Sequence, residues 1–248
     1  MRTADVQSTL SLEAGPAILS VMGKDEQSRL DAMNLEGMER RAAELDLVNQ
    51  FTGARAVFAL SQIHGSLAIR IDSTTFPGPP FPEADALYSS MSGVCLVVRT
   101  ADCMPLFFTA SRFGSPGEDV YGIIHAGWRG LAAGIITQTL RRVIQEIGDS
   151  GEETVVNLFT GPCISGENYE VGPDVAARFE IVSMAAGKPH VDLTENAMLE
   201  VERIASEYPR VTFNFQRDFA ACTVKENHRY YSHRKGDTGR NLNLLYIR

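Results

Sequence analysis

Three residues in this sequence could together bind a metal ion: His64, Cys103 and His125. Two imidazoles and a thiolate suit zinc, and three protein ligands leave a fourth position open for water or substrate. An open position is typical of a catalytic site rather than a structural one. The wide spacing matches no compact zinc motif. From the spacing alone, the two histidines are also explained as ordinary surface or core residues, and the cysteine as a small buried hydrophobic residue.

Each of the three residues follows a segment with the apolar, β-branched pattern of a buried strand. His64 comes directly after residues 56–63, Cys103 a few residues after 94–99, and His125 directly after 120–124. In sheets connected by helices, the carboxyl ends of neighbouring strands meet at one edge, where ligands bind. We therefore expect the three side chains to lie close together at such an edge.

Helical patterns alternate with the strands and complete the framework. The strand pattern recurs at 154–159 and 211–215, and apolar stripes predict helices at 36–47, 131–147, 173–184 and 195–208. Strands alternating with helices predict a layered α/β or α+β fold. There is no internal repeat and no shift in composition, so we expect a single domain over residues 1–248.

The composition excludes several classes of protein. The chain has 248 residues and a net charge of −8, so it lacks the basic surface that binding to nucleic acid requires. No apolar stretch is long enough to span a membrane. The N-terminus lacks the continuous apolar region of a signal peptide, so we expect a cytoplasmic protein with reduced thiols. A chain of this length folds without metal, which leaves a bound metal free for catalysis.

Six short segments resemble one known family. They are Gln62-Ile63-His64-Gly65, Glu83-Ala84-Asp85-Ala86-Leu87, Thr100-Ala101-Asp102-Cys103-Met104-Pro105, His125-Ala126-Gly127-Trp128-Arg129-Gly130, Gly161-Pro162-Cys163-Ile164 with Tyr169-Glu170-Val171, and Tyr231-Ser232-His233-Arg234-Lys235 with Thr238-Gly239-Arg240. Together they resemble the laccase-domain family, also called polyphenol-oxidase-like proteins or multifunctional purine nucleoside phosphorylases. The segments follow the family's order over about three quarters of the chain.

The resemblance implies a fold, a metal site and an activity. The fold would be an α/β sandwich of mixed β-sheets with flanking helices, and His64, Cys103 and His125 would bind one metal ion, usually zinc. The implied activities are phosphorolysis of adenosine, inosine and methylthioadenosine, and deamination of adenosine. The implied partners are therefore a purine nucleoside and phosphate. We expect a monomer or a weak homodimer.

Three further residues are candidates for binding or catalysis. Arg129 precedes the helix predicted near residue 131, where backbone N–H groups and a guanidinium could hold phosphate. Arg234 belongs to a basic segment and could line the pocket. Asp102 could act as a general acid or base, or could orient a ligand. For each there is a structural alternative: a surface ion pair for Arg129, a solvated loop for Arg234 and a turn cap for Asp102.

Two regions depart from the family pattern. The first 50 or so residues fit it poorly, with only Asn34-Leu35-Glu36-Gly37 faintly similar to the expected N-terminal segment. Near the C-terminus, Lys235-Gly236-Asp237 stands where family members usually have Arg-Asp-Gly. Asp237 is then the candidate substitute for the missing acid at position 236.

Three other kinds of protein remain as alternatives. A cysteine hydrolase would use Cys103 as nucleophile and His125 as base. A copper protein that oxidises phenols or transfers electrons would add a weak axial methionine, and Met104 adjoins Cys103. A zinc-stapled interaction module would need a fourth ligand such as His190 or His233 to close the site.

Overall fold

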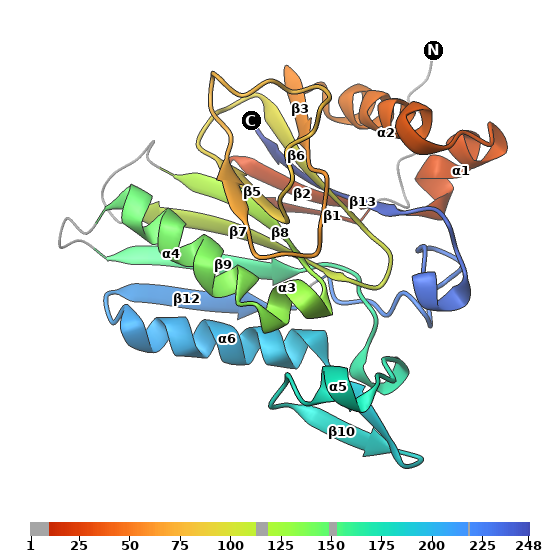
Figure 1. Ribbon diagram of the computed structural model, residues 1–248. Coiled ribbons are helices and arrows are strands. Elements are labelled where there is room, and N and C mark those ends of the chain that lie inside the picture. Colours follow the sequence, from red (N-terminus) through yellow and green to blue (C-terminus); the bar gives the residue numbers. More distant parts are fainter. Residues whose placement is uncertain (1–9, 113–118, 149–152, 218) are drawn as a thin grey trace.

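Two large β-sheets face each other and carry helices on both outer surfaces (Figure 1). The computed structural model describes residues 10–112, 119–148, 153–217 and 219–248. The first sheet contains, in spatial order, β1 (Leu10–Ala14), β2 (Ala17–Met22), β13 (Asn241–Ile247), β6 (Val94–Thr100) and β3 (Ala56–Ala59). The second sheet contains, in spatial order, β12 (Val211–Gln216), β9 (Thr154–Thr160), β7 (Met104–Arg112), β8 (Val120–Ala126), β5 (Ala86–Ser89) and β4 (Ala68–Arg70).

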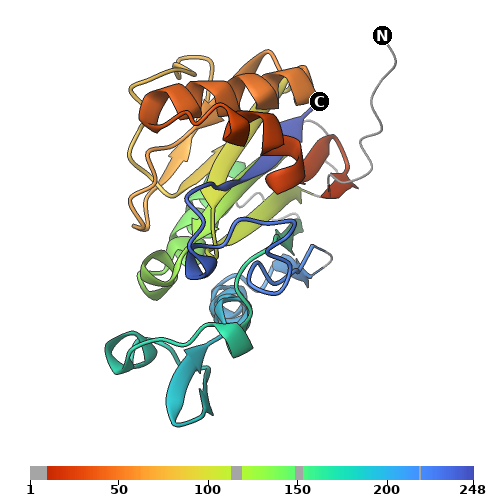
Figure 2. The same cartoon turned by 90° about the vertical axis from the view of Figure 1, so that its right-hand side faces the viewer.

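Both sheets are mixed. In the first sheet β3 runs parallel to β6, whereas β13 is antiparallel to its two neighbours. In the second sheet β12 is parallel to β9 and β4 to β5, while the central pairs are antiparallel. A small hairpin of β10 (Val182–Ala185) and β11 (Lys188–Val191) lies apart from both sheets (Figures 1 and 2).

The helices form the outer layers. Their bounds are α1 (Lys24–Ala32), α2 (Gly37–Thr52), α3 (Trp128–Ala132), α4 (Ile135–Ile147), α5 (Pro173–Ala176) and α6 (Leu193–Glu207), with short 3-10 turns at Gly166–Asn168 and His233–Lys235. The buried stripe of α4, which includes Ile136, Leu140 and Val143, packs on the second sheet together with α6. On the opposite side, α2 lies against the first sheet (Figure 2). Its Val48 belongs to the core between them.

The alternation of side chains along β8 determines where His125 points. Tyr121 and Ile123 belong to the core between the two sheets, while Val120 and Ile124 pack beneath the helices. Successive side chains of a strand point to opposite faces. His125 therefore shares the face of Ile123 and points towards the first sheet.

The predicted fold class, a layered α/β sandwich of mixed sheets with flanking helices, is confirmed. All five predicted strands are present as β3, β6, β8, β9 and β12, although β3 ends before residue 63. The predicted helices at 36–47 and 195–208 correspond to α2 and α6. No helix among the described residues is long and apolar enough to cross a membrane.

Two helix predictions need correction. The helix predicted at 131–147 is divided into α3 and α4, because Gly134 adopts a left-handed φ of 75° between them. The helix predicted at 173–184 is wrong beyond Ala176, since residues 182–185 form strand β10. There Ala186 and Gly187 both have positive φ, of 50° and 76°. Two such residues make the tight turn of a β-hairpin, which pairs Val182 with Val191.

The core between the sheets generates a stability prediction. Phe107 is fully buried there, with its ring centroid 6.4 Å from that of Phe219. We expect Phe107→Ala to lower the free energy of unfolding by about 3–5 kcal/mol, because the removed ring leaves a cavity. Urea denaturation measures this. Phe76→Ala is the control, since Phe76 is 71% exposed and should change stability by no more than about 0.5 kcal/mol. Equal losses for both variants would contradict this description of the core.

Candidate metal centre and its cavity

The structure brings His64, Cys103 and His125 together, with their ligand atoms all within 4.8 Å of one another. The rings of His64 and His125 meet edge to face, with centroids 4.9 Å apart. His64 follows β3, Cys103 lies between β6 and β7, and His125 is near the end of β8. Since β3 and β6 are parallel neighbours, their ends meet as expected. His125, however, comes from the facing sheet, so the cluster lies between two sheets and not at the edge of one.

The backbone around the cluster is held in unusual conformations. His64 and Asp102 have left-handed φ values of 59° and 82°, which cost energy in residues other than glycine. Gly127 follows β8 and approaches the cluster so closely that a Cβ atom there would lie 2.9 Å from Cys103 Sγ. These strained conformations place the loops of His64 and Cys103 beside His125.

Asp85 holds the cluster together, and sequence reasoning assigned it no role. Its side chain is fully buried, and its Oδ1 lies 2.8 Å from His125 Nδ1. The same carboxylate accepts hydrogen bonds from the backbone N–H groups of His64 at 2.9 Å and Gly65 at 2.6 Å. Because Nδ1 of His125 is engaged by Asp85, the other ring nitrogen is left for a metal ion. The sequence signal was available, since Asp85 lies in a motif shared with the family.

The charges of the cluster shift one another's pKa values. Burial alone would raise the pKa of Cys103, but hydrogen bonds from His125 and His64 outweigh it and lower the pKa overall. Burial opposes the charged form of His125, but Asp85 and Cys103 raise its pKa. Burial likewise opposes ionisation of Asp85, yet His125 and the N–H of Gly65 lower its pKa. The surroundings therefore favour an ionised thiolate, which is the form that binds metal, together with an ionised carboxylate and a protonated His125, whose proton a metal ion would displace.

The cluster opens onto a cavity of about 550 Å³ with a strongly basic wall. Its lining includes five arginines, namely Arg41, Arg99, Arg129, Arg234 and Arg240. Asp102 is the one carboxylate among the described residues that line it. A protein of net charge −8 thus concentrates positive charge in this one cavity. Such a cavity attracts anions.

Arg129 and Arg234 both line the cavity. Arg129 stacks on the ring of Trp128, 4.3 Å from its centroid, and Arg234 lies 5.5 Å from the ring centroid of Tyr169. The contribution predicted from a helix N-terminus needs correction, because α3 spans only five residues. So short a helix has little dipole. The guanidinium groups and aromatic rings are therefore the groups that this wall offers to a ligand.

Asp102 lines the cavity, but both of its oxygens accept hydrogen bonds from the protein. Oδ1 accepts from the Thr223 hydroxyl at 2.6 Å and Oδ2 from the backbone N–H of Arg234 at 2.7 Å. Asp102 thus ties the loop of Cys103 to the segment of Arg234. This geometry favours the positioning alternative over the role of general acid or base.

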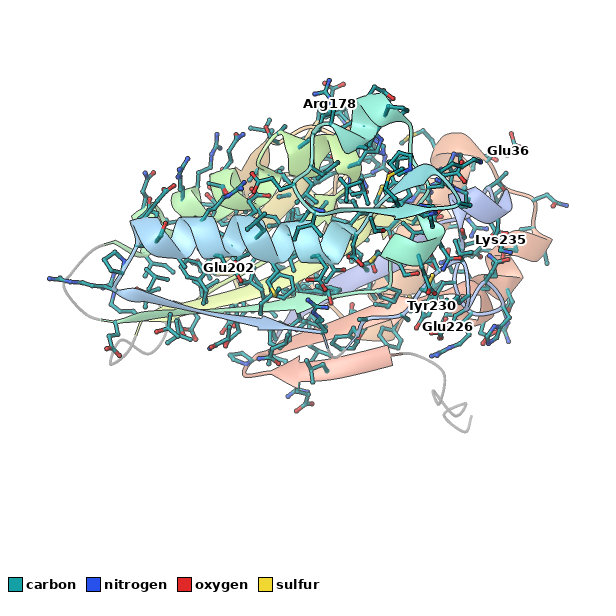
Figure 3. All side chains as sticks on the ribbon, turned by 90° about the horizontal axis from the view of Figure 1, so that it is seen from below. Glu36, Arg178, Glu202, Glu226, Tyr230 and Lys235 are labelled. Atoms are coloured by element: carbon teal, nitrogen blue, oxygen red, sulfur yellow. The ribbon has the colours of Figure 1, made fainter. Side chains whose placement is uncertain are left out.

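Other residues weighed in the sequence lie as follows. Asp237 accepts hydrogen bonds from the Ser232 N–H and the Asn227 side chain and pairs with Lys24, so it fixes a loop beside the cavity. Figure 3 shows Lys235 of that loop at the same end of the molecule as Glu36. His233 lines the cavity, but among the described residues the metal-type cluster contains three members and no fourth His, Cys, Asp or Glu. A closed four-ligand site is not formed by these residues.

The fold and the site define a mixed-sheet α/β sandwich with a His–Cys–His cluster at the base of a basic cavity. The family model described as "Multi-copper polyphenol oxidoreductase laccase" matches residues 36–248. The chain belongs to this family. The match includes α2, and with it Arg41, from the part of the chain that fits the sequence motifs poorly.

Relatives and a solved structure agree with this assignment. The chain is 32% identical over 191 residues to a protein of Deinococcus radiodurans named purine nucleoside phosphorylase, covering 73% of this chain and 66% of that protein. It is 33% identical over 161 residues to a Bacteroides thetaiotaomicron protein of the same name, covering 61% and 55%. The matches thus span less than two thirds of either relative. A crystal structure of a Neisseria meningitidis protein superposes with a TM-score of 0.71 and 25% identity, covering 97% of this chain and 99% of that one.

The contacts of Asp85 generate a prediction for metal binding. Asp85→Asn keeps the shape of the side chain but removes the charge that orients His125. We expect zinc affinity to fall about 10–100-fold, which is typical when a partner of a ligating histidine is lost. Competition with a chelating dye measures the affinity. Asp174→Asn, at an exposed position on α5, is the control and should leave affinity unchanged. Equal zinc affinity in both variants would show that Asp85 does not support the site.

Proposed function

We propose that this protein is a zinc-dependent purine nucleoside phosphorylase. Its substrates would be adenosine, inosine and methylthioadenosine, with deamination of adenosine as a second activity. One observation carries the proposal: the His64–Cys103–His125 cluster opens onto a cavity rich in arginine. The names of the relatives support the same reaction.

The residues present fit a zinc ion. A thiolate and two imidazoles within 4.8 Å of one another can share one ion, and Asp85 orients one of the imidazoles. His64, Cys103 and His125 would hold the metal, with the cavity at the remaining position. When bound, zinc supplies a Lewis acid and lowers the pKa of a coordinated water.

The side chains of the cavity suit both substrates of phosphorolysis. In that reaction an oxygen of hydrogen phosphate bonds to C1′ of the ribose while the bond from C1′ to the purine nitrogen breaks. The proton that the phosphate loses passes to the purine, giving free purine and ribose 1-phosphate. The arginines would hold the phosphate anion and orient it towards C1′. The rings of Trp128 and Tyr169 also line the cavity and would offer apolar faces to the purine. A volume of about 550 Å³ is in the usual range for small-molecule sites.

A cysteine hydrolase is the second candidate, because Asp85, His125 and Cys103 form a chain of contacts in the order acid, base, nucleophile. Against it, His64 also hydrogen-bonds Cys103 and completes a donor set that a hydrolase does not need. Metal content separates the two proposals. Stoichiometric zinc in the purified protein leaves no free thiolate to act as nucleophile.

The copper alternative relied on Met104 as an axial ligand. Met104 is fully buried in the core beneath the helices, where its sulfur lies 3.7 Å from the Thr194 hydroxyl. Cys103 faces the cavity instead, as expected of neighbouring residues at the start of a strand. Met104 is therefore not placed to complete a blue-copper donor set.

The proposed function is tested by incubating the zinc-loaded protein with adenosine or inosine, with and without phosphate. We expect free purine and ribose 1-phosphate only when phosphate is present, and inosine from adenosine without it if deamination also occurs. His125→Ala should lower phosphorolysis by more than about 100-fold, because even partners of metal ligands are worth 10–100-fold. Chromatography of the products measures both reactions.

His228→Ala is the matched control, since His228 is exposed and does not line the cavity. It should retain the activity of the unmodified protein. Absence of turnover of either nucleoside by zinc-loaded protein, with or without phosphate, would overturn the proposed function.

A further inference from the structure

Three arginines from separate parts of the chain line one side of the cavity. Arg41 comes from α2, Arg99 from β6, and Arg240 from the residue before β13. Strands β6 and β13 are paired, with Thr100 opposite Asn241, so Arg99 and Arg240 arrive on adjacent strands. The fold therefore gathers them by tertiary contacts, and no sequence motif contains all three.

The ion pairs that these three guanidinium groups form do not balance their positive charge. Glu44 pairs with Arg99 at 2.8 Å, but it also pairs with Arg40 at 3.0 Å. Arg41 and Arg240 form no ion pair with any described residue. Instead, Arg41 donates to the carbonyl of Leu60, and Arg240 donates to the carbonyls of Thr238 and Gly239.

Arg41 also keeps a donor unused. Its Nε is buried and has no hydrogen-bond partner among the described residues. The guanidinium lies over the ring of Phe81, 4.2 Å from its centroid, which fixes the side chain without neutralising it. A buried donor without a partner costs free energy.

The charge of Arg99 acts on both of the other guanidinium groups. Burial lowers the pKa of Arg41, and the charge of Arg99 lowers it further. Burial and the charge of Arg99 lower the pKa of Arg240 in the same way. Arg99 thus lies close enough to act on both neighbours. Like charges held together in this way are stabilised by a bound counter-anion.

We propose that Arg41, Arg99 and Arg240 form a subsite that binds a phosphate group. Arg129 and Arg234 also line the cavity, but they come from α3 and from the 3-10 turn at His233–Lys235, and they lie beside Trp128 and Tyr169. These two arginines and their aromatic neighbours would then contact the nucleoside, and the three-arginine subsite would hold the anion. Within the proposed function, on which this assignment rests, the anion is the phosphate that attacks C1′.

The chemistry of the subsite favours phosphate over a carboxylate. Planar guanidinium groups bind phosphate oxygens in pairs, and three groups on one wall can reach several oxygens of a tetrahedral anion. Glu44 is the one described carboxylate that forms an ion pair with any of the three, and it also pairs with Arg40, so the dianion of phosphate would add more compensating charge than a carboxylate. The group could be inorganic phosphate or the phosphate ester of a nucleotide, and both contain the same tetrahedral dianion.

The test is direct titration of the zinc-loaded, full-length protein by isothermal titration calorimetry, first with inorganic phosphate and then with adenosine 5′-monophosphate. Arg41→Gln and Arg240→Gln should each weaken binding of the phosphate group by about tenfold or more, because each removes a charge-assisted hydrogen bond. Arg240→Lys should retain part of the affinity by keeping the charge. Arg141→Gln is the control, since Arg141 pairs with Glu207 on an exposed helix face. Thermal melting confirms that each variant is folded.

Weaker binding in the two Gln variants but not in the control supports the subsite. If this holds for inorganic phosphate the anion is the attacking phosphate, and if it holds only for the nucleotide the group is an ester. Unchanged binding in both Gln variants, binding that depends on Arg129 instead, or no binding of either probe to the unmodified protein overturns it.

The outcome is separable from that of the proposed function. Binding that depends on these arginines, without nucleoside cleavage, would support the subsite and contradict the proposed phosphorylase activity. Cleavage with an unchanged KM for phosphate in Arg41→Gln and Arg240→Gln would support the phosphorylase activity and contradict the subsite.

Discussion

The candidate site depends on one buried carboxylate, Asp85. It receives the ring of His125 from one sheet and the backbone of His64 and Gly65 from the loop that follows the other sheet. A fully buried carboxylate is tolerated only when hydrogen bonds and positive charge compensate its loss of water. The same contacts that satisfy Asp85 therefore also fix the distance between the two histidines. Asp85 thus links the two sheets at the place where the cluster lies.

The second constraint is electrostatic. The protein is acidic as a whole, yet it directs five arginines into the cavity next to the cluster. Arg41, Arg129 and Arg234 each lie near an aromatic ring, and among the described residues Arg41 and Arg240 have only backbone carbonyls as hydrogen-bond partners. This arrangement costs stability in the empty protein and becomes favourable when an anion binds. A cavity wall that attracts anions suits the proposed reaction, in which phosphate is a substrate.

Much of this arrangement could be predicted from the sequence, because local patterns determine it. Buried strands such as β6 and β8 are recognisable in the sequence as apolar runs, and each candidate metal ligand follows a strand of this kind. The segment after Ala176 was predicted wrongly as helix, because the hairpin depends on the left-handed turn at Ala186 and Gly187. The facing arrangement of the two sheets came from the family resemblance and not from residue patterns.

Asp85, Arg41 and Arg99 were missed as site residues for a different physical reason. Asp85 lies in a motif shared with the family, but by residue pattern alone it looks like an ordinary loop acid before a short strand of the second sheet. Arg41 and Arg99 resemble exposed charges on a helix and a strand, and only the packing of α2 against the first sheet turns them towards the cavity. Long-range contacts of this kind leave no spacing pattern that a single sequence can show.

The central claim is that His64, Cys103 and His125 share one metal ion. Anomalous X-ray diffraction from crystals of the purified protein, measured on both sides of the zinc absorption edge, tests this directly. The account predicts one anomalous peak, about 2.0–2.1 Å from a nitrogen of each histidine and about 2.3 Å from the sulfur of Cys103. The absence of a peak among these three side chains in zinc-supplemented crystals would contradict it.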